Sequence, residues 1–135
     1  LYRRAALFSR RHVMAGALAA PFFPAPSTSQ GATHEVLSCC MNLARLFPAS
    51  LDSARALGMV CRSCDLAEET PSELIDALCP DPASRALLAS GPEDAIRRWA
   101  DAKSRADFAA GRVARADGWV FAETEIRLFS LLAGM

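Results

Sequence analysis

Apolar residues recur at intervals of three and four along most of the chain after residue 35, which is the spacing of amphipathic helices. The pattern is broadest near the C-terminus, where Ile126, Phe129 and Leu132 contribute to a wide apolar face. Six helical segments are expected: residues 36–47, residues 51–64, segments beginning at Pro71 and at Pro82, a longer segment from Pro92 to about Gly111, and residues 123–133.

Several of these segments begin with recognisable start signals. Thr70 precedes a proline at the first helical position and is followed three residues later by Glu73, which is the arrangement of a capping box. Asp81 also precedes a proline, and Ser50 is expected to cap the segment that follows it. These signals predict where the helices begin.

One stretch departs from the helical pattern. Asp117 and Gly118 form a turn dipeptide between two short segments, 113–116 and 119–121, that suit an extended backbone. We therefore expect a mainly α fold: a single small domain of five or six short helices around one core, with one short β-ribbon or extended turn near residues 113–121.

Composition supports one domain and argues against charged partners. The chain has 135 residues, of which 52% are hydrophobic, so it is long enough for one core. Fifteen basic and fifteen acidic residues balance, which gives no general attraction to nucleic acid or to an anionic membrane. The exception is the start of the chain, where four arginines precede the first acidic residue, Glu35.

These arginines belong to a targeting pattern. Residues 9–14, which contain the pair Arg10 and Arg11, resemble the twin-arginine export motif. The apolar run at 13–23 is too short for a stable transmembrane anchor and suits a cleavable signal. We expect residues 1–31 to be a twin-arginine signal peptide and linker, cleaved near Gly31, and residues 32–135 to be a helical mature domain in the periplasm. An Arg-rich tail on a cytosolic protein is the alternative.

Five cysteines are many for a chain of this size: Cys39, Cys40, Cys61, Cys64 and Cys79. In an oxidising compartment they could form two disulfides, whose pairing the sequence does not fix. Cys61 and Cys64 have the spacing of a redox couple or of half a metal site. They fall at the end of a predicted helix, where the helix dipole disfavours a thiolate, so structural cysteines are the main expectation and metal or redox roles are alternatives.

Other chemistry-bearing residues have ordinary structural interpretations. Glu123 and Glu125 are expected to complement the dipole of the last helix, because residues two apart point to different sides and cannot act as a catalytic pair. Arg112, Arg115 and Arg127 could bind an anion, but solvated positions at the rim or ion pairs with Asp107, Asp117 and Glu123 are expected instead. No catalytic set or cofactor fingerprint is found.

Trp119 is the sharpest local feature, because a large aromatic residue beside a tight turn either fills the core or anchors an interface. The core role is the main expectation and a possible interface is the alternative.

The C-terminal residues carry a resemblance. Asp107–Val113, the triplet Asp-Gly-Trp at 117–119 and the pair Thr124-Glu125 resemble a pattern in small, uncharacterised twin-arginine (Tat) proteins of proteobacteria. In that pattern a serine usually stands where this chain has Ala122, which puts the simple cap of the last helix in doubt; Thr124 could substitute. The resemblance implies no activity.

Export in a folded state favours a protein that is transported together with a partner. The leading hypothesis is therefore an accessory subunit or binding module without a catalytic centre, handled by the Tat translocase and docking on another exported protein. The alternative is a periplasmic metal-binding or thiol-disulfide protein that uses Cys61 and Cys64. No cofactor is indicated.

Overall fold

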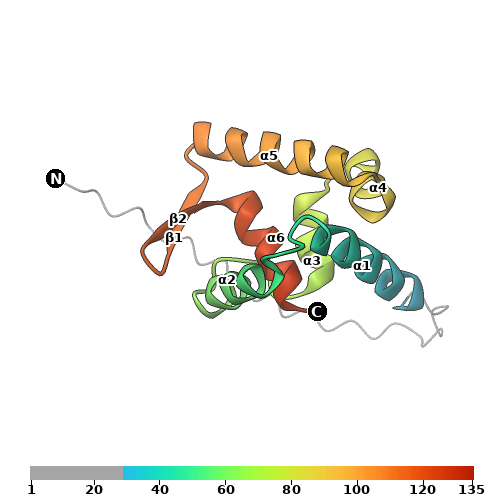
Figure 1. The fold of residues 1–135 in the computed structure, drawn as a ribbon, viewed down its shortest axis with the longest axis horizontal. Coiled ribbons are helices and arrows are strands. Elements are labelled where there is room, and N and C mark those ends of the chain that lie inside the picture. The colour runs from blue at the N-terminus through green and yellow to red at the C-terminus, as the bar shows by residue number, and fades with distance from the viewer. Residues whose placement is uncertain (1–28) are drawn as a thin grey trace, which may run out of the picture.

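The structure is a computed structural model that describes residues 29–135 (Figure 1). Within this part the chain forms six helices and one two-stranded antiparallel sheet, which confirms the predicted fold class. The elements are α1 (Ser29–Ala44), α2 (Leu51–Ser63), α3 (Pro71–Leu78), α4 (Pro82–Ser90), α5 (Glu93–Ala109), β1 (Val113–Ala116), β2 (Trp119–Ala122) and α6 (Glu123–Ala133). The predicted export signal, including Arg10 and Arg11, lies outside the described residues.

The helix-start signals are confirmed at two of three positions. The Thr70 hydroxyl accepts a hydrogen bond from the Glu73 amide at 3.3 Å, and the Glu73 carboxylate accepts one from the Thr70 amide at 3.0 Å. The Asp81 carboxylate accepts from the amide of Ser84 at 2.8 Å. Ser50 occupies the N-cap position of α2, but its side chain forms no capping hydrogen bond.

The first helix differs from its predicted bounds. It begins at Ser29 rather than at residue 36, since residues 32–35 contain no residue that breaks a helix. It ends at Ala44, because the chain then turns, with the Leu46 amide donating to the Leu43 carbonyl, ahead of Pro48. The cleavage point predicted near Gly31 therefore falls inside this helix.

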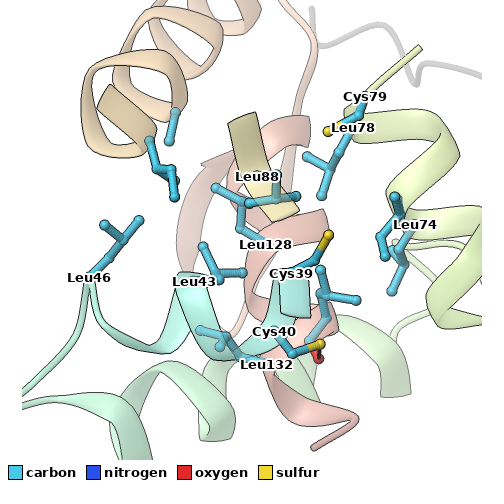
Figure 2. Packing of buried hydrophobic residues seen from close by; sticks show 14 of the residues in the cluster. Cys39, Cys40, Leu43, Leu46, Leu74, Leu78, Cys79, Leu88, Leu128 and Leu132 are labelled. Carbon is cyan, nitrogen blue, oxygen red and sulfur yellow. Dashed lines mark hydrogen bonds between the residues drawn. The ribbon is translucent and has the colours of Figure 1, made fainter. Parts of the chain in front are cut away.

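Helix α6 lies at the centre of the molecule and packs against α1, α2, α3 and α5 (Figure 1). Its buried leucines face those of α1, α3 and α4, with Cys39 and Cys79 filling small gaps between them (Figure 2). Burial of this apolar surface is the main source of stability. None of the described helices is both long and apolar enough to cross a membrane.

The closest helix crossing is between α2 and α6, and it depends on a glycine. A Cβ atom added to Gly58 would lie 1.9 Å from the carbonyl oxygen of Phe129. That contact is with backbone, so a side chain at this position requires the two helices to separate. Gly58 therefore fixes how tightly α2 packs on the central helix.

A second, smaller cluster attaches the hairpin to the helices. Cys61 of α2, Ala116 of β1 and Ile126 of α6 are buried together, with Phe121 packed against them. The Phe121 ring also meets Phe129 edge-on, with ring centroids 6.1 Å apart. One face of the hairpin is thus fixed on α2 and α6, and its turn lies at the opposite end of the molecule from the start of α1 (Figure 1).

Candidate functional site

The hairpin has the two-residue turn that the sequence predicts. Asp117 and Gly118 both have positive φ angles, 49° and 82°, as the tight turn between twisted strands requires. The strands pair in register, with Ala116 opposite Trp119 and Ala114 opposite Phe121. Residues directly opposite each other project from the same face of a ribbon, and so do residues two apart on one strand. The rings of Trp119 and Phe121 therefore both lie on the face that meets α2.

Trp119 is not the core residue that the sequence favoured. It is 68% exposed, whereas its partner Ala116 is 3% exposed. Both residues border the turn, but Ala116 is buried with Cys61 and Ile126, whereas Trp119 is not part of that cluster. Phe121, two residues further along the same face, is the aromatic residue packed against the core.

An open apolar groove lies between the exposed tryptophan and α2. We call it the hairpin groove; it has a volume of about 520 Å³ and is lined by Ser53, Ala56, Leu57, Val60, Asp117, Trp119 and Phe121. Sites that bind apolar groups commonly measure about 300–1,000 Å³ and carry few polar groups. The groove can therefore accept several apolar side chains, and it offers no catalytic set of residues.

The hairpin is anchored by a buried carboxylate that the sequence analysis treated only as an arginine partner. Asp107, near the end of α5, is 6% exposed. It accepts hydrogen bonds from the Thr124 amide at 2.8 Å, the Thr124 hydroxyl at 2.6 Å and the Arg112 guanidinium at 2.8 Å. Burial by itself raises the pKa of Asp107, but these hydrogen bonds outweigh it and hold the pKa below its usual value.

This anchor explains how α6 begins without a serine at its cap. Ala122 has no side-chain oxygen, and Asp107 supplies the missing acceptor from a different helix. Thr124 does not replace the serine, because it lies inside α6 as the second helical residue, where both its amide and its hydroxyl donate to Asp107. The Glu125 carboxylate accepts from the Ala122 amide at 2.9 Å, which confirms its expected role at the helix start.

All three arginines agree with the structural interpretation, two of them as ion-pair partners and Arg115 as a solvated residue. Arg112 pairs with Asp107 at 2.8 Å, and Arg127 pairs with Glu123 at 3.2 Å as well as with Glu68 at 2.9 Å. Arg115 forms no ion pair with a described residue. Its position opposite Val120 places it on the face of the hairpin that points away from the groove.

The five cysteines are unpaired thiols, and four of them are buried. Burial raises the pKa of Cys39 to about 12 and that of Cys79 to about 11, which keeps both protonated and poorly nucleophilic. Cys61 is buried in α2, where burial raises the pKa of its thiol, and Cys64 is exposed at the C-cap of that helix. The predicted placement of this pair at a helix end is confirmed.

Metal-binding geometry is not found in the described part of the chain. No three side chains from His, Cys, Asp or Glu come together there in a way that could hold a metal ion. His34 is exposed on α1, whereas Cys39 and Cys40 of the same helix are buried.

No protein-family model matches the chain, and no match was found among curated proteins or among solved structures.

Proposed function

We propose that this chain is a binding module without its own catalytic centre, an accessory subunit that docks on another exported protein through the hairpin groove. The exposure of Trp119 beside this groove is the observation that carries the proposal. Tryptophan is a preferred anchor at protein interfaces, because it buries a large area at a low cost in conformational entropy.

The neighbours of Trp119 support this interpretation, because they already have structural roles. Asp117 and Gly118 form the turn, and Phe121 packs on the core. Trp119 contributes little to the core, and an exposed ring of this size beside an apolar groove is typical of a docking surface.

The proposed location in the periplasm depends on a different part of the chain. The arginine pair at Arg10 and Arg11, followed by a mildly apolar run, is the basis for export by the Tat translocase. The partner would then be another exported protein.

Co-purification with a matched pair of variants tests the proposal. The tagged chain is recovered from periplasmic extract as wild type, as Trp119→Ala and as Phe108→Ala, which removes an exposed aromatic ring that does not line the groove. We expect one protein to co-purify in stoichiometric amount with wild type and Phe108→Ala. Loss of an interface anchor weakens affinity by about thirtyfold, so the partner protein should no longer co-purify with Trp119→Ala.

The control for folding is thermal unfolding of the same three proteins. Because Trp119 is largely exposed, Trp119→Ala should change the free energy of unfolding by less than about 0.5 kcal/mol. Retention of the same partner by Trp119→Ala would refute the role of the hairpin groove.

A further inference from the structure

The charges around the hairpin groove are all of one sign. Among its seven lining residues Asp117 is charged and none is basic. Asp52, in the first turn of α2, lies four residues before Ala56 and so on the same face of the helix, at the end of the groove that Ser53 lines. Both carboxylates are exposed, and neither forms an ion pair with a described residue.

The nearest basic residues face elsewhere. Arg55 and Arg62 each stand two positions from a groove residue on α2, which turns them to the other side of that helix. The Arg62 guanidinium donates to the carbonyl of Glu69 at 3.2 Å. Arg115 projects from the opposite face of the hairpin. The result is an apolar groove bordered by two unpaired acidic groups, Asp52 and Asp117.

The length of the groove indicates what kind of segment fits it. Its helical wall runs from Ser53 to Val60, which is about 10 Å at 1.5 Å per residue. This is two turns of a second helix, enough for apolar side chains at positions i, i+3 or i+4, and i+7 to enter the groove.

We infer that the occupant is a cationic amphipathic helix of the partner protein, whose apolar stripe fills the hairpin groove and whose flanking Lys or Arg side chains meet Asp52 and Asp117. The inference rests on the proposed function and specifies the partner's chemistry. Exposed ion pairs are individually weak, up to about fivefold in affinity each. Together the two pairs should favour a basic helix over an acidic one by about tenfold.

Fluorescence of the full chain tests this preference. Trp99→Phe leaves Trp119 as the sole tryptophan of the chain, which has two. The probes are two synthetic 18-residue helical peptides. Both have the same leucine stripe, and all remaining positions are lysine in one peptide and glutamate in the other. We expect the leucine–lysine peptide to shift Trp119 emission to shorter wavelength and to bind about tenfold more tightly. Its affinity should fall as salt is added.

Neutral variants isolate the charge effect. In the Trp99→Phe background, Asp52→Asn together with Asp117→Asn should bring the two peptide affinities to within about twofold of each other. Asparagine tolerates the positive φ at position 117, so the turn is kept. Phe108→Ala is the matched control and should keep the full preference.

Each contrary result of the peptide experiment leads to a different conclusion. Equal binding of both peptides to the protein with both aspartates would overturn the charge inference and leave the docking function standing. Binding of neither peptide would overturn the helical occupant, while Trp119-dependent co-purification would still test the docking function separately. A concentration-dependent emission shift without peptide would assign the groove to a second copy. If the Trp119 emission is typical of a buried ring at every protein concentration, the hairpin groove is filled by residues of the same chain.

Discussion

Replacing Asp107 removes the group on which the hairpin and the central helix both depend. In the Asp107→Ala variant the Thr124 amide at the start of α6 loses its acceptor, and so do the Thr124 hydroxyl and the Arg112 guanidinium. We expect this substitution to destabilise the protein more than any change to the exposed tip of the hairpin.

The magnitude follows from the three hydrogen bonds. Loss of a helix cap costs about 0.5–2 kcal/mol. A buried hydroxyl without a partner, here that of Thr124, costs about 1–3 kcal/mol. Arg112 is half-exposed, so its ion pair contributes less than about 1 kcal/mol. The free energy of unfolding should therefore fall by about 2–4 kcal/mol.

Urea unfolding followed by circular dichroism measures this loss, and a double-mutant cycle with Thr124→Val identifies its source. Thr124→Val keeps the shape of the side chain but removes the hydroxyl donor. If the hydroxyl bond contributes as argued, Thr124→Val costs about 1–2 kcal/mol less in the Asp107→Ala background than in wild type. Additive effects would refute the contribution of the hydroxyl, and a loss below about 1 kcal/mol for Asp107→Ala would refute the role of the carboxylate as the cap of α6.

The pH dependence gives an independent check on the same carboxylate. The pKa of Asp107 is lower in the folded protein than in the unfolded chain, so the unfolded chain takes up a proton first as the pH falls. The stabilisation is therefore complete above the unfolded pKa, near pH 4, and is lost as the pH drops through the folded value. The stability gap between wild type and Asp107→Asn should narrow over that acidic range; a constant gap would contradict the assignment.

Three further variants test other parts of the molecule. Gly58→Ala should cost about 1–3 kcal/mol in urea unfolding, because its Cβ would collide with the backbone of Phe129; a gain of about 1 kcal/mol, as helix propensity alone predicts, would refute the close crossing. Ser130→Ala should leave stability unchanged or raise it by up to about 1 kcal/mol, because the buried Ser130 hydroxyl has no partner in the described structure; a clear loss would reveal a hidden contact. Arg10→Lys combined with Arg11→Lys should hold the chain in the cytoplasm on cell fractionation, and unchanged periplasmic delivery would remove the export argument.

The helices could be predicted because their signals are local. Thr70, Glu73 and Asp81 each bond within three residues along the chain, so the capping pattern that the sequence displays is the one that the structure uses. The start of α1 differs from the prediction, because residues 31–34 are exposed and so carry no apolar pattern that would mark them as part of a helix.

The site was harder to predict, because its determinants are distant in the sequence. Asp107 acts on Thr124 across 17 positions, and no local pattern indicates that one helix caps another. The groove joins α2 to a hairpin more than fifty residues later. The sequence favoured a core role for Trp119, whereas the aromatic residue on the core is Phe121, because residue type and spacing alone do not show which side chains of a short ribbon the helices cover.

The anchor and the groove are coupled through the hairpin, although Asp107 does not line the groove. The strands are only four residues long, and a short two-stranded ribbon is marginally stable without support from the rest of the fold. Here that support comes from Asp107 at the end of β2 and from Phe121 on the core. Loosening the anchor would let the ribbon and Trp119 sample other positions, and a wall that is no longer pre-organised binds more weakly. Asp107→Asn should therefore weaken peptide binding to the groove under conditions where the helices remain folded, whereas a variant with unchanged affinity would show that the wall is held by Phe121 alone.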